Sequence, residues 1–137
     1  MVDCGLAQGG DSAVAIDAWP LPPTKIDYLF LTHAHIDHTG RVPELIRKGF
    51  GGEIICSHPT KALLSPMLAD AMRFSGMPAK TAGPTAKAID DLSWGFEYGE
   101  RFDLENGVAF MLRRAGHILG SCFVRIEDER NGWSVLF

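Results

Sequence analysis

Residues 31–40 read LTHAHIDHTG, and three histidines and one aspartate fall within six consecutive positions of this stretch. It overlaps the end of residues 26–32, IDYLFLT, a short run rich in aromatic and β-branched residues that follows a Pro-rich turn. Such a run predicts a buried strand. The four polar side chains therefore gather where a strand ends, and their grouping is unfavourable unless something neutralises or bridges them.

The spacing within this cluster favours a metal site. His33 and His35 point the same way if the chain stays extended, and a tight turn afterwards brings Asp37 and His38 to a neighbouring point. Zinc is the natural candidate because it accepts imidazole nitrogen and carboxylate oxygen, and a catalytic zinc keeps one position open for water. Two adjacent metals suit hydrolysis. The competing interpretation is a solvated polar loop, which explains one histidine better than four such groups.

Three further residues stand apart from this cluster. His117 lies between two glycines in a loop that joins two strand-like runs, and glycine permits the close backbone approach that aims a ligand into a site. Taken alone, His117 is more often structural, and Asp3 in VDCG is more often a turn-capping aspartate. His58 sits beside Pro59 at a helix start without a spaced partner, so a non-functional role is favoured for it.

The rest of the chain predicts an α/β fold. A short helix is expected within residues 40–50, a strand at 53–57 and a longer helix within 59–76 despite its internal proline. A weakly ordered region at 78–91 precedes strand-like runs at 96–102, 108–114, 122–127 and 133–137. Asn131-Gly132, between the last two runs, predicts a type I′ hairpin turn.

Composition sets the broad class. The 137 residues suit one domain, and the formal net charge of −4 counts mildly against a nucleic-acid substrate. There is neither a long apolar run for a membrane span nor a secretory signal, so we expect a cytoplasmic protein. Three cysteines without CxxC spacing fit a reducing compartment, with buried positions expected for Cys4, Cys56 and Cys122.

Taken in order, VDCGLAQGG at 2–10, THAHIDHTG at 32–40 and AGHILGS at 115–121 resemble the metallo-β-lactamase superfamily. The second stretch fills every position of its HxHxDH signature. The first and third look like the branch that carries a β-CASP insert and processes RNA, unlike the glyoxalase II type of hydrolase. Residues 49–64, GFGGEIICSHPTKALL, also resemble that branch.

The resemblance implies a partial αββα sandwich, namely its N-terminal half with helices on the face of a mixed sheet. It also implies a zinc-dependent RNA phosphodiesterase with two zinc ions and an RNA substrate. His33, His35 and His117 would hold the first zinc, and the catalytic pair Asp37 and His38 would hold the second. Asp37 would also orient the attacking hydroxide, and Asp3 would orient a ligand histidine through a hydrogen bond.

The resemblance is incomplete at both ends. The family's bridging fourth-motif aspartate, the β-CASP insert, the second half of the sandwich and the strands that usually precede VDCG are missing. We therefore expect residues 1–137 to form a partial domain, whose metal binding and activity on its own stay open. An exposed core face would form a large apolar patch, so self-association is also expected.

Two other functions stay open. A small-molecule hydrolase of the same superfamily would act on a thioester or lactam, and the sequence beyond Phe137 would separate it from a nuclease. A non-catalytic scaffold subunit is disfavoured because the signature ligands within the span are all kept. The choice between endonuclease and exonuclease, and between RNA and DNA, is also left open.

Overall fold

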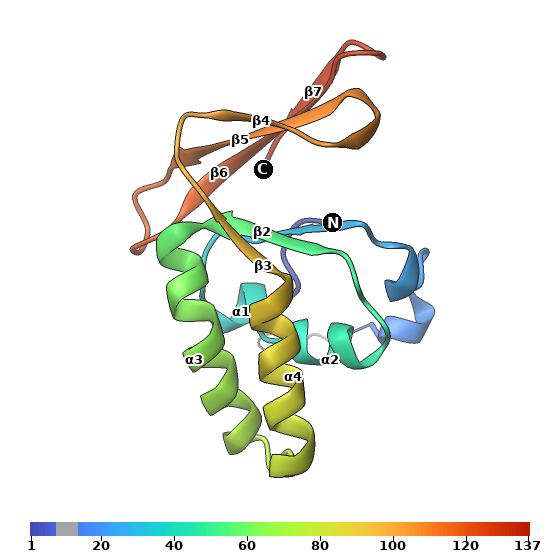
Figure 1. Cartoon of the computed structure of the whole chain (residues 1–137), viewed down its shortest axis with the longest axis vertical. Coiled ribbons are helices and arrows are strands. Elements are labelled where there is room, and N and C mark those ends of the chain that lie inside the picture. Colours follow the sequence, from blue (N-terminus) through green and yellow to red (C-terminus); the bar gives the residue numbers. More distant parts are fainter. Residues whose placement is uncertain (8–13) are drawn as a thin grey trace.

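Three layers make up the chain in a computed structural model that describes residues 1–7 and 14–137 (Figure 1). Helices cover one face of a three-stranded parallel sheet, and a four-stranded antiparallel sheet lies on the other side. This arrangement agrees with the expected α/β class. The end of the first motif, residues 8–10, lies outside the described residues.

The parallel sheet has the order β1-β2-β3, formed by Tyr28–Phe30, Glu53–Ser57 and Ser93–Phe96. Parallel neighbours need crossover connections, and helices supply them here. The first crossover contains α1 (Ile36–Thr39) and α2 (Val42–Arg47), and the second contains α3 (His58–Phe74) and α4 (Ala79–Leu92).

Burial on both faces explains why β1 and β2 are largely apolar. Leu29 and Ile54 join the core between the sheet and the helices, whereas Phe30 and Ile55 join the core between the two sheets. Alternate residues of one strand thus serve two cores. This makes the parallel sheet the central layer, and its strand ends are held on both sides.

The antiparallel sheet has the order β4-β5-β6-β7, formed by Arg101–Asp103, Val108–Arg114, Cys122–Asp128 and Trp133–Leu136. Phe110, Leu112 and Val124 face the central layer and are buried. In the part of the chain that the structure describes, short 3-10 helices form at Ile16–Ala18 and Pro23–Lys25, before β1, and at Glu105–Gly107, between β4 and β5.

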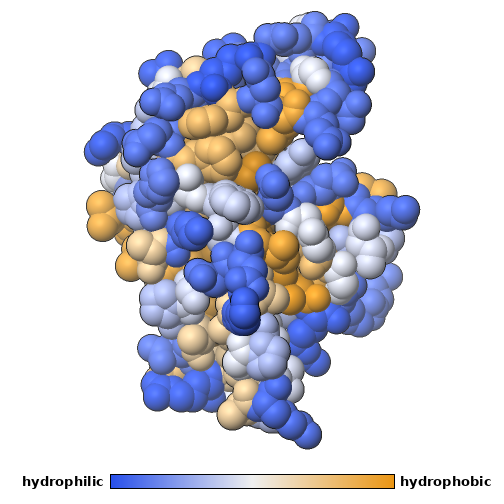
Figure 2. Space-filling model, viewed as in Figure 1, coloured by the Kyte–Doolittle hydropathy of each residue, from blue (hydrophilic) through white to orange (hydrophobic). Residues whose placement is uncertain are grey.

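Apolar surface is exposed at the outer part of this second sheet. Phe123 is 48% exposed, Trp133 47% and Leu136 65%. An open cavity of about 1210 Å³ is lined by residues of both sheets, Tyr28 and Ile126 among them. Figure 2 shows apolar side chains gathered on the viewed face at the level of the two sheets. Self-association through such surface stays a prediction.

The expected weakly ordered region at 78–91 is wrong, because the structure forms α4 there. Gly83 and Pro84 lie inside the helix, and both residue types are unfavourable there, so the sequence does not indicate a helix. Ile89 is completely buried among the helices, and α4 packs against α2 and α3. Tertiary packing therefore overrides weak helix propensity in this segment.

Two other local expectations are corrected. The single strand at 96–102 is split between β3 and β4 in different sheets, and Gly99 with a φ of 81° turns the chain between them. The turn before β7 is not type I′, because Asp3 and Asn106 are the non-glycine residues of the described part with positive φ. Asn131 instead donates to the Asp128 carboxylate, which closes a longer loop.

The remaining elements fall close to the expected ranges. The three cysteines are buried and free, as expected, and burial raises the pKa of each thiol to about 12. Within residues 1–7 and 14–137, every helix is too short or too polar to cross a membrane.

Candidate metal centre

The signature stretch leaves the central sheet directly after β1. The backbone N–H of Leu31 still donates to the Ile55 carbonyl, so the strand pairing holds the chain up to the first polar residue. His35 then serves as the N-cap residue of the one-turn helix α1. Thr39, fully buried, donates its hydroxyl to the carbonyls of Ala34 and His35 at 3.3 and 3.0 Å. This local packing fixes the turn between the two parts of the signature.

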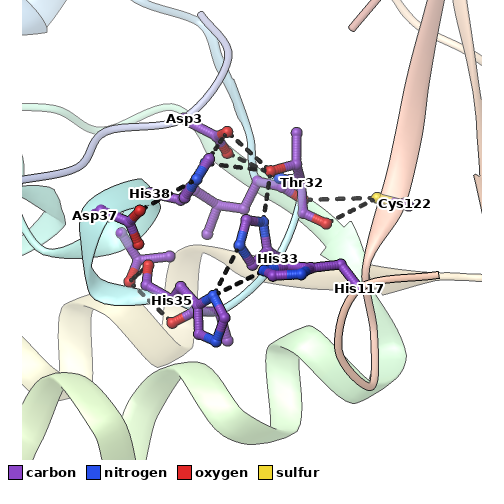
Figure 3. A network of polar contacts seen from close by, with 11 residues as sticks. Asp3, Thr32, His33, His35, Asp37, His38, His117 and Cys122 are labelled. Atoms are coloured by element: carbon purple, nitrogen blue, oxygen red, sulfur yellow. Dashed lines mark hydrogen bonds and ion pairs between the residues drawn. The ribbon is translucent and has the colours of Figure 1, made fainter. Parts of the chain in front are cut away.

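Three imidazoles converge at this turn (Figure 3). His35 Nδ1 lies 3.1 Å from His33 Nε2 and 3.1 Å from His117 Nε2. Each pair of ring centroids is 4.8 Å apart, with interplanar angles of 74° to 85°. His117 comes from the loop between β5 and β6, 82 residues away from His35 in the chain.

The spacing of the three nitrogens fits a zinc-sized cation. A tetrahedral zinc with Zn–N bonds of about 2.0–2.1 Å places neighbouring ligand nitrogens roughly 3.3–3.4 Å apart. The observed 3.1 Å contacts are close to that spacing, and all three donor atoms lie within 4.8 Å of one another. Neutral imidazole nitrogens are also donors that zinc prefers.

Thr32 orients the first of these rings. Its hydroxyl lies 2.8 Å from Asp3 Oδ2 and 3.0 Å from His33 Nδ1. A carboxylate only accepts hydrogen bonds, so the hydroxyl donates to Asp3 and its oxygen accepts from His33 Nδ1–H. This tautomer leaves His33 Nε2 with a free lone pair that points toward His35 and His117.

The His33 pKa is lowered from its ordinary value. Burial is the largest cause, since the residue is only 7% exposed, and the neighbouring His38, His35 and His117 add to it. Desolvation penalises the charged imidazolium, and nearby imidazoles oppose a second positive charge. The ring is therefore kept neutral, which is the form that binds a metal.

The other half of the signature lies on α1. His38 Nε2 is 3.6 Å from Asp37 Oδ2, and the His38 ring centroid is 4.0 Å from that of His33. Asp3 Oδ2 accepts a 2.6 Å hydrogen bond from His38 Nδ1, which leaves His38 Nε2 free on the side of Asp37. Asp37 and His38 thus form a second donor pair directly beside the three imidazoles.

The segment that carries Asp3 is clamped against α1. Asp3 has a φ of 52°, an uncommon backbone conformation for a residue with a side chain. The N–H of Cys4 donates to the His38 carbonyl at 2.7 Å. A Cβ on Gly5 would lie 1.4 Å from the Asp37 carbonyl oxygen, so only glycine allows this approach.

Thr32 and Gly5 also contribute to this site, although the sequence motifs assign them no role. Both stand inside the quoted motif stretches, directly before His33 and shortly after Asp3. Their positions next to predicted site residues are the signal that was available. Their contacts are tertiary and are not visible in the spacing.

His58 lies outside the group of three imidazoles. Its Nε2 is 3.6 Å from Glu97 Oε1, and both side chains are more than half exposed. A non-functional role of His58 stays a prediction.

Comparison with known proteins gives the site its family. The sequence pattern of the metallo-beta-lactamase superfamily matches residues 1–133. Two solved structures share the fold. A metallo-beta-lactamase with a HARLDQ motif from Cronobacter sakazakii has a TM-score of 0.59 at 19% identity, covering 89% of this chain and 44% of that one. A subclass B3 metallo-beta-lactamase from a soil metagenome has a TM-score of 0.56 at 21% identity, covering 88% and 44%.

Curated relatives point to one branch. Ribonuclease TTHA0252 of Thermus thermophilus is 33% identical over 94% of this chain and 30% of its own length. The transcription termination factor FttA of Methanocaldococcus jannaschii is 28% identical, covering 93% and 21%. Endoribonuclease YSH1 of Saccharomyces cerevisiae is 31% identical, covering 100% and 19%. The chain thus spans less than a third of the length of each of these relatives.

These names confirm the predicted resemblance to the RNA-processing β-CASP branch. The matched pattern runs through both halves of the signature and the His117 loop. With this match over residues 1–133, the chain belongs to the metallo-beta-lactamase superfamily.

Proposed function

We propose that this chain carries the metal-binding part of a zinc-dependent hydrolase that cleaves phosphodiester bonds in RNA. The convergence of three imidazole nitrogens beside the Asp37–His38 pair is the observation that carries the proposal. Relatives named ribonuclease and endoribonuclease support RNA as the substrate. We further propose that residues 1–137 form a partial domain of a longer protein.

The residues divide into two sets of ligands. His33, His35 and His117 would hold one zinc ion, and Asp37 with His38 would hold a second. Bound metals of this kind acidify water and offset the charge that develops on a phosphate group. Side chains of the protein have the other roles. Asp3 and Thr32 hold the rings of His38 and His33, and Asp37 would orient the attacking water through its carboxylate.

The net charge of the chain does not itself favour an RNA substrate. With a net charge of −4 it offers no broad positive field for a polyanion. Phosphate recognition would therefore depend on the positive charge of metal ions bound at the histidine cluster.

The test begins with zinc content. Elemental mass spectrometry on protein purified without chelator should find about one zinc or more per chain. The double variant His33→Ala/His35→Ala should lose it, while His58→Ala should keep it because that ring lies outside the cluster. A double variant that keeps the full zinc content of the parent chain would contradict the assigned ligands.

The reaction is tested with end-labelled single-stranded RNA and the zinc-loaded protein. Cleavage should depend on Asp37 and fall in Asp37→Asn, whereas Glu97→Gln should behave like the parent chain. A zinc-loaded chain that hydrolyses a thioester or lactam and leaves RNA intact would overturn the ribonuclease proposal. That outcome would favour the small-molecule hydrolase.

A further inference from the structure

The loop that carries His117 rests on a buried polar contact with the start of α3. We propose that Ser57 and Thr60 are positioning residues that set the place of His117 in the metal centre. The proposal rests on the proposed function, since it assigns a task to residues outside the ligand set. It concerns residues that neither the family signature nor the ligand cluster includes.

Two hydroxyls converge on one carbonyl of the loop. Ser57 Oγ lies 2.7 Å and Thr60 Oγ1 3.0 Å from the Gly120 carbonyl oxygen. Both side chains are fully buried, with 0% exposure. A carbonyl oxygen has two lone pairs and accepts both bonds. A buried double contact of this kind holds the loop at one point of the central layer.

The fit between loop and helix is tight enough to require glycine. Gly120 has a φ of 91°, and a Cβ there would lie 2.5 Å from Thr60 Oγ1 and 2.7 Å from Thr60 N. The loop is therefore pressed against the first turn of α3. Any shift of Gly120 breaks contacts with Ser57 and Thr60 together.

The contact is transmitted to His117 through a closed turn. Ser121 Oγ accepts from the Ile118 N–H at 2.9 Å, and the Ser121 N–H donates to the Ile118 carbonyl at 3.0 Å. The Ala115 N–H donates to the Ser121 carbonyl at 3.0 Å and closes the base of the loop. His117 thus moves with Gly120 as part of one small unit.

The origin of the three ligands explains why such a device is needed. His33 and His35 follow β1 in the central sheet, whereas His117 belongs to the loop between β5 and β6 of the other sheet. Ser57 ends β2, the neighbour of β1. The Ser57–Gly120 contact therefore fixes the position of the His117 loop relative to β2. This strand lies beside β1, which leads into His33 and His35.

A purely structural role would be helix capping, and the two roles are separable. Ser57 Oγ accepts from the Thr60 N–H and so caps α3. Thr60→Val keeps the side-chain shape and this cap but removes one donor to Gly120. Ser57→Ala/Thr60→Val removes both donors and the cap as well, so Thr60→Val alone separates the two roles, and Thr60→Ser keeps the hydroxyl. Thr85→Val is the matched control, because this buried hydroxyl donates to the Thr81 carbonyl within α4.

The first readout needs no metal. Ring-proton NOEs between His35 and His117 report the place of His117, and those between His33 and His35 serve as the internal reference, since both pairs have centroids 4.8 Å apart. We expect the His35–His117 NOE to weaken in Thr60→Val and to vanish in the double variant. The reference NOE should remain, and Thr60→Ser and Thr85→Val should match the parent chain.

The second readout is cobalt affinity, followed by the visible absorption of the bound ion. We expect the double variant to bind Co²⁺ about 10- to 100-fold more weakly, as is usual when an outer partner of a ligand is lost. Thr60→Ser should keep the parental affinity because it keeps the hydroxyl, and Thr60→Val should weaken it although the cap remains. Thr85→Val should keep the affinity even if its melting temperature falls. A double variant with parental NOEs, or with altered NOEs but parental affinity, would overturn the proposal. If the parent chain binds no cobalt, the proposed function fails, and the NOE comparison alone decides the positioning role.

Discussion

The two halves of the candidate metal centre are built in different ways. The three-imidazole half draws His33 and His35 from one loop and His117 from another, 82 residues beyond His35. The Asp37–His38 half comes from a single turn of α1. The first half therefore forms only when the two sheets dock, whereas the second brings its two ligands together within one helical turn. Long-range docking and local sequence spacing contribute separately to one site.

Asp3 links the halves. Its Oδ2 accepts hydrogen bonds from His38 Nδ1 at 2.6 Å and from the Thr32 hydroxyl at 2.8 Å. The Thr32 hydroxyl oxygen in turn accepts a hydrogen bond from His33 Nδ1. One carboxylate thus orients a ring in each half. The comparison predicts that some changes affect one half alone and that a change at Asp3 affects both.

The largest effect is expected for His35→Ala. His35 Nδ1 contacts the rings of both His33 and His117. Its removal therefore takes away the ligand atom that lies next to each of the other two. Zinc affinity at this position should fall by more than the roughly 100-fold that loss of an outer partner costs. Calorimetric titration with zinc measures this, with His58→Ala as control. An affinity unchanged by His35→Ala would mean that the half does not bind metal.

Asp3→Asn should weaken both halves together. The amide keeps the size of the side chain but lacks the charge and one acceptor needed by His38 and Thr32. We expect metal affinity to fall about 10- to 100-fold at both positions, measured by stepwise zinc titration. A loss confined to one position would show that Asp3 does not couple the halves.

Gly5→Ala tests the second half through its backbone. The added methyl would overlap the Asp37 carbonyl, so the segment or α1 has to shift. Forced overlap of this kind costs about 1–3 kcal/mol of unfolding free energy. Gly83→Ala, where the methyl meets no atom within 4 Å inside α4, should leave stability equal or higher. Urea denaturation of both variants measures the difference, and equal stabilities would argue against the clamp.

A smaller effect concerns the pH dependence of the metal-free chain. The His33 pKa is lowered in the folded state, mainly by burial, so the unfolded chain binds a proton more readily. Above its ordinary pKa of about 6.5, His33 should not change the free energy of unfolding. As the pH falls from there through the folded-state pKa, the free energy of unfolding should decrease. Denaturation midpoints at several pH values measure the slope, which His33→Gln should reduce. An NMR titration that places His33 at or above its ordinary pKa would contradict the assignment.

Sequence reasoning located the second half more completely than the first. The HxHxDH spacing places His33, His35, Asp37 and His38 at one strand end, and the structure gathers them there. The approach of His117 was expected only through the family resemblance, because nothing local ties residue 117 to residue 35. Contacts between sheets depend on packing, which the spacing of residues along one segment does not encode.

The same reason explains what was missed in the fold. The strands at 53–57 and 108–114 stand out because each contains a short apolar run, and the structure buries most of that run. Helix α4 does not, since its stability comes from packing Ile89 against other helices and not from its own propensity. The roles of Thr32 and Gly5 likewise depend on neighbours distant in sequence.

The most direct test of the two-part metal centre is a crystal soaked in zinc and measured at the zinc absorption edge. We predict one anomalous peak among His33 Nε2, His35 Nδ1 and His117 Nε2, and a second beside Asp37 and His38. Absence of a peak among the three imidazoles, with zinc bound elsewhere on the chain, would contradict the account.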